Sequence, residues 1–122
     1  MDQNKNVLLL GASLKSYRYS FTALQLLRAN NHYVHAVGKE EGQAGENMVS
    51  SHLPPIEKFH TVSLYLNPKN QRDYYEKLFM YSPERVIFNP GSENEELEEL
   101  CKERGVQVVK DCTIMMLKRG AF

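Results

Sequence analysis

The sequence predicts an α/β fold, a doubly wound parallel sheet of five strands with helices on both of its faces. Residues 7–10 form an unbroken apolar run, which is typical of a strand buried on both faces of a sheet. Strand-like and helix-like patterns then alternate along the chain. Because strands joined by helical crossovers are parallel and the crossovers are right-handed, this alternation indicates an open sheet that winds in both directions.

Cap and turn residues separate the expected elements. Asn67 and Pro68 mark a helix start, because Asn caps helices and Pro suits the first helical position; that helix is expected to end near residue 81. Residues 92–95 match a capping box that opens a helix through Arg104, and Gly105 lies where a left-handed cap is expected. Two further helices are expected near residues 21–30 and 113–118.

The predicted strands and their order follow from the same patterns. The strands are expected at residues 7–10, 33–37, 61–66, 85–88 and 106–109, in the spatial order 3-2-1-4-5. In this order the loops that follow the first and the fourth strand face each other at the carboxyl edge of the sheet. Residues 38–60 lack a clean period and are expected to form a long loop with at most one short helical turn.

Length, charge and cysteine content limit the class of protein. A chain of 122 residues fits one domain, 1–122, around one core. The 15 Lys and Arg residues offset 15 Asp and Glu residues, so no basic face for nucleic acid is expected. No apolar stretch approaches the ~20 residues that cross a bilayer and the start of the chain is polar, so a cytoplasmic protein without membrane contact is expected. The 2 cysteines and 4 histidines lack metal-ligand spacing, so no metal site is expected.

The loop after the first strand has the features of a phosphate-binding loop. The dinucleotide fingerprint would place glycines at positions 11, 13 and 16, where this chain has Gly11, Ser13 and Ser16, so the match is partial. Gly11 permits a tight turn, the following helix offers free N–H groups, and Lys15 and Arg18 add positive charge. The alternative is an ordinary strand-to-helix loop with solvated cations.

The end of the second strand favours a phosphorylated ribose. An NAD site has an acidic residue there, whereas this chain has Gly38 and Lys39, followed by Glu40 and Glu41. Lys39 therefore favours CoA or NADP, although the two glutamates weaken the argument. No catalytic residues are identified, because the chain lacks a G-x-x-x-x-G-K-[ST] motif and no nucleophile arrangement stands out.

Several short motifs occur together in an order that resembles one family. They are residues 11–13, 18–20, 64–68, 89–92, 94–97 and 111–112. In these motifs the chain resembles the stand-alone CoA-binding domain proteins, which are similar to the N-terminal domain of the succinyl-CoA synthetase alpha subunit. The resemblance implies a Rossmann-like domain that holds CoA at the carboxyl edge of its sheet.

The resemblance also implies a set of ligand contacts. The implied cofactor-binding residues are Gly11, Ala12, Ser13, Lys15, Arg18, Tyr19, Ser20, Gly38, Lys39, Asn67, Pro68, Asn89 and Gly91. The family often has Asn-Pro where this chain has Gly38 and Lys39, which affects the adenosine side of the site. The part of the synthetase that carries its phosphohistidine is not represented in this sequence, so ligase activity is not expected.

Three functions remain open from the sequence. The first is a CoA or acyl-CoA binding protein without catalysis of its own. The second is an NAD(P)-binding redox sensor or a domain derived from an oxidoreductase. The third is a regulatory protein-interaction module that keeps the fold with an empty nucleotide site. The residue at position 39 separates the first two, because lysine favours CoA or NADP over NAD.

Overall fold

The computed structural model describes residues 4–122 and contains a sheet in the order β3-β4-β2-β1-β5-β6-β7. The strands are β1 (Asn6–Leu10), β2 (Tyr33–Val37), β3 (Gly42–Ala44), β4 (Asn47–Ser50), β5 (Thr61–Leu64), β6 (Arg85–Phe88) and β7 (Gln107–Lys110). The helices are α1 (Tyr19–Ala29), α2 (Pro68–Gln71), the 3₁₀ turn η1 (Arg72–Tyr74), α3 (Tyr75–Met80), α4 (Glu95–Glu103) and α5 (Thr113–Lys118). All strand pairs are parallel except β3 with β4.

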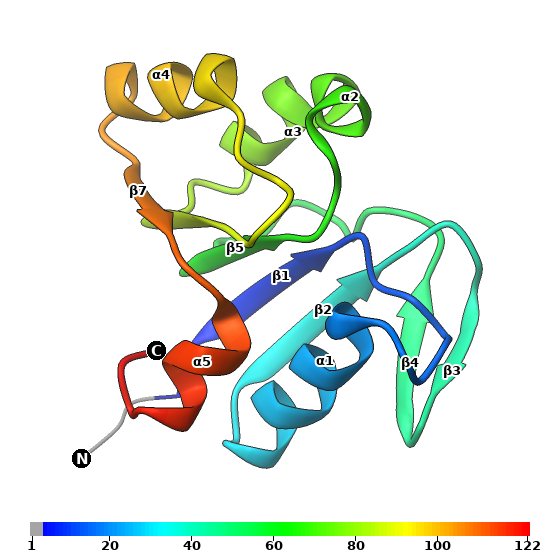
Figure 1. Ribbon diagram of the computed structural model, residues 1–122. Helices are drawn as coiled ribbons and strands as arrows, with labels where there is room; N and C mark the ends of the chain where they lie inside the picture. The colour runs from blue at the N-terminus through cyan, green and yellow to red at the C-terminus, as the bar shows by residue number, and fades with distance from the viewer. Residues whose placement is uncertain (1–3) are drawn as a thin grey trace.

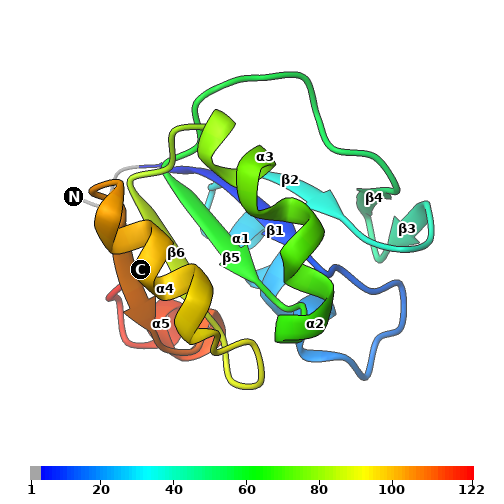
Figure 2. The same ribbon diagram turned by 90° about the horizontal axis from the view of Figure 1, so that it is seen from above.

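Helices cover both faces of this sheet, which confirms the predicted α/β class (Figure 1). α1 and α5 lie on one face, and α2, α3 and α4 lie on the other, as the view from above also shows (Figure 2). Side chains along β1 alternate between two cores: Leu8 and Leu10 pack in the cluster on the α3 and α4 side, whereas Leu9 packs with Leu24 of α1. The unbroken apolar run of β1 is therefore buried on both faces, as expected.

The predicted strand order 3-2-1-4-5 is wrong. The third predicted strand, β5, pairs with β1 and β6, so the order of the five predicted strands is 2-1-3-4-5. The place beside β2 is taken by β4, which pairs with it through Ala36 with Val49 and Val37 with Ser50. All four residues of β5 are buried, as the centre of a sheet requires. The loop after β5 consequently separates the loops after β1 and β6, which were expected to face each other.

Residues 38–60 contain a β-hairpin, which the sequence analysis did not predict. β3 and β4 pair in an antiparallel manner, with Gly42 opposite Val49 and Ala44 opposite Asn47. Gln25 of α1 holds this hairpin: its side-chain N–H donates to the Ala44 carbonyl at 2.8 Å, and its Oε1 accepts from the Asn47 side chain at 2.8 Å. The hairpin is thus attached to α1 through a side chain as well as to β2 through the sheet.

Two expected helices differ in detail. The helix expected to run to residue 81 is divided into α2, η1 and α3, although it does begin with Asn67 as cap and Pro68 in the first position. The helix expected from the capping box at Ser92 begins at Glu95 instead, because the Asn94 side chain accepts hydrogen bonds from the first turn. Gly105 has a φ of 73°, which confirms the left-handed cap. Within residues 4–122, none of the helices has the length and apolar character needed to span a bilayer.

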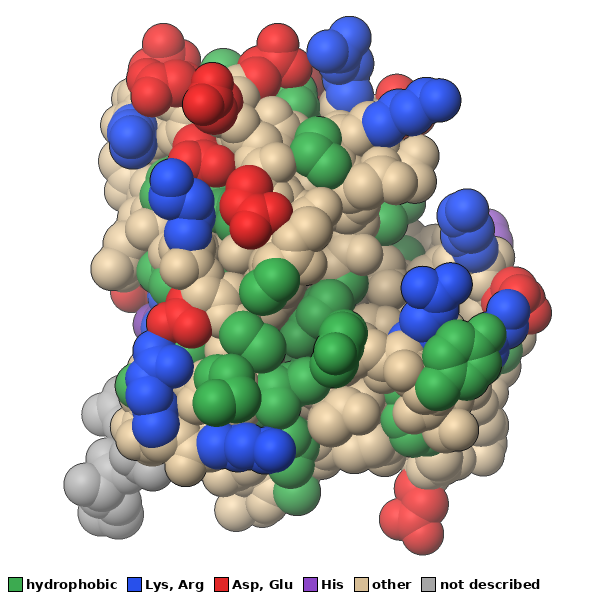
Figure 3. Space-filling model, viewed as in Figure 1, with side chains coloured by type: hydrophobic (Ala, Val, Ile, Leu, Met, Phe, Trp, Pro, Cys, Tyr) green, Lys and Arg blue, Asp and Glu red, His purple; other side chains and the backbone are tan. Residues whose placement is uncertain are grey.

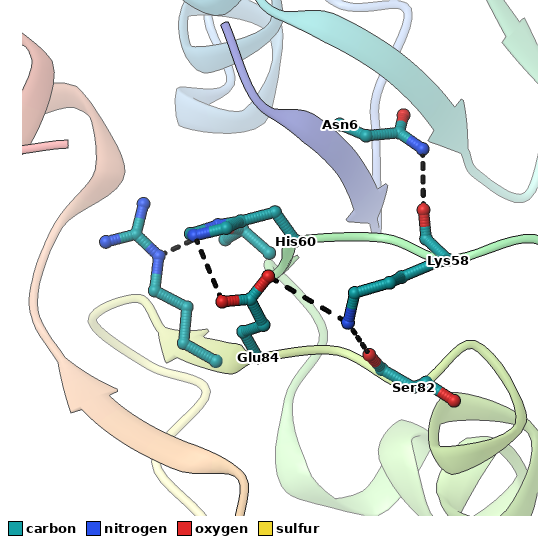
Figure 4. A network of polar contacts seen from close by, with 7 residues as sticks. Asn6, Lys58, His60, Ser82 and Glu84 are labelled. Atoms are coloured by element: carbon teal, nitrogen blue, oxygen red, sulfur yellow. Dashed lines mark hydrogen bonds and ion pairs between the residues drawn. The ribbon is translucent and has the colours of Figure 1, made fainter. Parts of the chain in front are cut away.

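Polar contacts join the starts of β1, β5 and β6 at the amino edge of the sheet (Figure 4). The Asn6 side chain donates to the Lys58 carbonyl at 2.8 Å, and the Lys58 ammonium donates to the Ser82 carbonyl at 2.9 Å. Glu84 lies 3.9 Å from both Lys58 and His60. Burial lowers the pKa of His60, and the attraction of Glu84 opposes that effect. These contacts belong to the edge opposite the cavity described below and serve to align the strands.

We expect Gln25→Ala to loosen the β3–β4 hairpin. The substitution removes both hydrogen bonds between α1 and the hairpin, which together contribute roughly 1–2 kcal/mol. Amide hydrogen exchange will show faster exchange in residues 42–50, while β1, β5 and β6 keep their protection. Thr22→Ala, an exposed position on the same helix, is the control and will leave the exchange of the hairpin unchanged. Unchanged protection of the hairpin in Gln25→Ala would contradict this role.

Candidate functional site

A cavity of about 760 Å³ opens at the carboxyl edge of the sheet, where β1, β2 and β5 end. These three strands point toward the same side of the molecule, as Figure 2 shows from above. Five parts of the chain form the walls: the loop from β1 into α1, the residues after β2, Ser51 after β4, the segment from β5 through η1, and Pro90 after β6. Ligands of doubly wound sheets bind at this edge, so the cavity is the candidate site.

Most of the residues expected to bind a cofactor line this cavity. The lining includes Gly11, Ala12, Ser13, Lys15, Arg18, Tyr19, Ser20, Gly38, Lys39 and Asn67. Pro68, Asn89 and Gly91 lie outside the lining, although Pro90 belongs to it. Pro68 is the first residue of α2, where its fixed φ and missing N–H suit a helix start. The positions of ten residues from distant parts of the chain therefore agree with one site.

Two glycines allow the walls to come close together. Gly11 has a φ of 88°, and a Cβ there would lie 2.8 Å from the backbone carbon of Tyr65. At Gly38 a Cβ would lie only 2.0 Å from the carbonyl oxygen of Ala12. The Val37 carbonyl accepts hydrogen bonds at 2.9 Å from the N–H groups of both Gly11 and Ala12. The ends of β1, β2 and β5 are thus packed backbone against backbone.

The loop from β1 into α1 is held by its own serines. The Ser20 hydroxyl is buried and accepts from the Ser13 N–H at 3.1 Å, and the Ser13 hydroxyl accepts from the Lys15 N–H at 3.1 Å. Arg18 is the N-cap residue of α1 and gives the helix no side-chain cap, and the first turn contains no acidic residue. The positive end of α1 therefore faces the cavity without a neutralising side chain, which suits an anion.

Three cations line one part of the cavity. Lys15, Arg18 and Lys39 are exposed, and within residues 4–122 no ion pair engages them. Arg18 lies 5.7 Å from the ring centroid of Tyr17, which is itself largely exposed. Figure 3 shows Lys and Arg side chains on the side of the molecule that carries the loops after β1 and β2, with acidic side chains beside them, and it shows several acidic side chains over α4. Glu40 lines the cavity next to Lys39, so the three cations outnumber the acidic residues in this part of the lining.

The lining changes character toward β5 and β6. Tyr65, Leu66 and Pro90 supply apolar surface, the amides of Asn67 and Asn70 supply neutral polar groups, and Asp73 supplies one carboxylate. Burial raises the pKa of the Tyr65 hydroxyl, with a smaller contribution from Cys112, so this side chain stays neutral. One part of the cavity thus contains three cations, and the other contains apolar surface, amide groups and a carboxylate.

Asn89 lies beneath the cavity as a structural residue. Its side chain is fully buried and donates to the Ser63 hydroxyl at 2.9 Å and the Leu64 carbonyl at 2.8 Å. Its Oδ1 accepts from the Thr113 N–H at 2.8 Å, and Thr113 in turn lies 2.8 Å from the Ser63 hydroxyl. These bonds join the ends of β5 and β6 to the start of α5. The Asn89 side chain, which was expected to bind the cofactor, is therefore occupied by hydrogen bonds within the protein.

Several lining residues were not predicted from the sequence. Asn70, Asp73 and Tyr74 line the cavity from one side, and their spacing of three and four residues was a signal that they share a helical face. Ser51 also lines it, but its position depends on the unpredicted β3–β4 hairpin, for which the sequence carried no such signal. Tyr65 and Leu66 lie in the motif of residues 64–68, but neither was predicted to contact the cofactor.

Among residues 4–122, neither His nor Cys lines the cavity, whereas hydroxyl, amine and carboxylate side chains do. Cys101 is buried in the core, where burial raises the pKa of its thiol to about 11. Cys112 precedes α5 and is half-buried, outside the lining. The described part of the chain also has no group of His, Cys, Asp and Glu side chains that fits a metal ion.

Comparison with known proteins identifies the family. The family model of the CoA binding domain matches residues 5–118. A crystal structure of an uncharacterized protein is 40% identical, with a TM-score of 0.94, and the match covers 99% of this chain and 100% of that chain. No curated protein matches.

Two more distant structures share the fold. A hypothetical protein from Pyrococcus horikoshii OT3 is 22% identical, with a TM-score of 0.83, over 96% of this chain and 84% of that chain. The cell-free ID.343 protein from Thermus thermophilus is 20% identical, with a TM-score of 0.80, over 98% of this chain and 91% of that chain. Because the family model spans nearly the whole sequence, this chain belongs to the CoA binding domain family, which is related to the N-terminal CoA-binding domain of the succinyl-CoA synthetase alpha subunit.

Proposed function

We propose that this protein binds CoA or acyl-CoA without catalysing a reaction on it. The observation that carries the proposal is the division of the cavity into a cationic part and a part with apolar and amide groups. CoA has the same division, because its nucleotide end carries phosphates and its pantetheine arm carries amides and methylene groups. A dinucleotide has a second charged nucleotide in place of that arm, and the apolar part of the cavity suits it less well.

Within this proposal each part of the ligand has a set of partners. The pyrophosphate lies beside residues 11–13 at the N-terminus of α1, where N–H groups of the first helical turn and Arg18 bind it. Lys39, at the end of β2, binds the phosphate on the ribose. The pantetheine arm follows Leu66 and Asn67 toward Pro90.

We expect CoA to raise the melting temperature of the protein and NAD to leave it unchanged. A ligand present at 100 times its dissociation constant stabilises the folded state by about 2.7 kcal/mol. Lys39 stands where an NAD site would have an acidic residue, so NAD lacks its ribose partner. The measurement is a thermal shift series with CoA, acetyl-CoA, NADP and NAD. Stabilisation by NAD with no response to CoA would refute the assignment.

We expect Arg18→Ala to weaken CoA binding while the fold remains intact. Arg18 is exposed in the loop and is outside the apolar core, so its loss removes a phosphate partner only. A charge-assisted hydrogen bond contributes roughly 1.5–3 kcal/mol, which corresponds to about a 10- to 100-fold loss of affinity in calorimetry. Arg28→Ala, at the other end of α1, is the control and will bind CoA like the parent. Equal affinities for Arg18→Ala and the parent would remove Arg18 from the site.

We expect Lys39→Ala to abolish the preference for CoA over 3′-dephospho-CoA. If Lys39 binds the ribose phosphate, the variant loses affinity for CoA, whereas its affinity for dephospho-CoA stays close to that of the parent. The expected change is about tenfold for CoA. Lys69→Ala, on the exposed surface of α2 and outside the lining, is the matched control. An equal loss for both ligands would show that Lys39 contacts another part of the molecule.

A further inference from the structure

Gln71, the last residue of α2, is a fully buried polar side chain that uses its hydrogen-bonding capacity at three points. Its Nε2 donates to the Leu66 carbonyl and to the Ser92 carbonyl, each at 2.8 Å. Its Oε1 accepts from the side-chain amide of Asn94 at 3.0 Å. Both amide hydrogens and the acceptor oxygen of Gln71 are therefore engaged by other groups of the protein.

These bonds join two loops that follow different strands of the sheet. Leu66 follows β5, whereas Ser92 and Asn94 follow β6. Asn94 extends the connection, because its side chain also donates to the Tyr75 hydroxyl at 2.8 Å and caps α4. The Asn94 N–H donates to Glu98 at 3.1 Å. Gln71 is thus the point where the wall formed after β5 is attached to α4 and the loop before it.

The wall held by Gln71 is the apolar part of the cavity. Leu66 and the adjacent Asn67 line the cavity, and so does Pro90 on the opposite loop. The cationic part of the cavity is held by different contacts, namely the serine hydrogen bonds of the β1–α1 loop and the bonds to the Val37 carbonyl. α2 has four residues and continues as a 3₁₀ turn, so its own backbone bonds restrain this wall only weakly.

We infer that Gln71 is a positioning residue for the part of the cavity that receives the pantetheine arm, and that the phosphate part does not depend on it. This inference rests on the proposed function. Without the Gln71 amide, the carbonyls of Leu66 and Ser92 lose their buried donor and turn toward other partners, so the wall moves away from its binding position. The arm then has to order the wall as it binds, which lowers the affinity.

The test compares two ligands on Gln71→Met, a variant of similar length that has no amide. Calorimetry with CoA will show an affinity about tenfold lower than that of the parent. Adenosine 3′,5′-bisphosphate has the 3′-phosphate and the first 5′-phosphate of CoA but no pantetheine arm, and the affinity of Gln71→Met for it will stay within about twofold of that of the parent. Tyr81→Phe is the control for stability, because it removes another buried hydrogen bond, from Tyr81 to the Pro54 carbonyl, at the other end of the same helical segment. This control will bind both ligands like the parent.

The outcomes separate the inference from the proposed function. Equal CoA affinity of Gln71→Met and the parent overturns the inference, as does an equal loss for both ligands, which indicates a general effect on the fold. Failure of the parent to bind CoA overturns the proposed function and the inference with it. If Gln71→Met does not fold, Asn94→Asp provides a second comparison, because Asp retains the helix cap but places an oxygen opposite the Gln71 oxygen and so removes the bond that orients the Gln71 amide toward the Leu66 and Ser92 carbonyls.

Discussion

The close packing of backbone at the ends of β1, β2 and β5 is the constraint on which the candidate site depends. Gly38 lies so near the Ala12 carbonyl, and Gly11 so near Tyr65, that a side chain at either position would push the walls apart. The two N–H groups that share the Val37 carbonyl fix the direction in which the β1–α1 loop leaves the sheet. That direction places the uncapped N-terminus of α1 beside the cavity. The arrangement of charge at the site therefore follows from backbone geometry more than from any single cation.

A network of buried side-chain amides holds the loops that follow β5 and β6. Asn89 joins β5, β6 and α5, while Gln71 joins the wall after β5 to the loop before α4. Buried amides that satisfy several backbone groups at once are costly to replace, because each lost bond leaves a buried donor or acceptor without a partner. The network holds the apolar part of the cavity in one conformation. In the proposed function, a ligand arm made of amides and methylene groups would bind without having to order the wall.

The sequence predicted the features that depend on local pattern. The apolar run of β1, the Asn67 cap and the loop before α1 are each encoded within a few neighbouring residues, and the structure confirms the first two and places the third at the cavity. Strand order depends on which partner a strand finds across the sheet, and the pattern of β5 fits a place beside either β1 or β2. The β3–β4 hairpin occupies the edge of β2, so β5 pairs with β1 instead. The short strands of the hairpin resemble a loop in sequence. For the same reason Ser51 was missed as a lining residue, because its position depends on the hairpin.

The pair Gly38 and Lys39 gives the adenosine side of this site its own chemistry. Family resemblance leads one to expect Asn-Pro here, but a side chain at position 38 would collide with the Ala12 carbonyl in this structure. The glycine therefore allows β2 to end against the β1 loop, and the contact that an Asn side chain would make is lost. Lys39 stands in place of the proline, whose ring would fix φ, and it adds a positive charge at the same edge of the cavity. In the proposed site, recognition of the ribose phosphate would depend on attraction to the exposed Lys39 ammonium, which salt weakens, whereas the pyrophosphate would meet backbone groups that the fold holds in place.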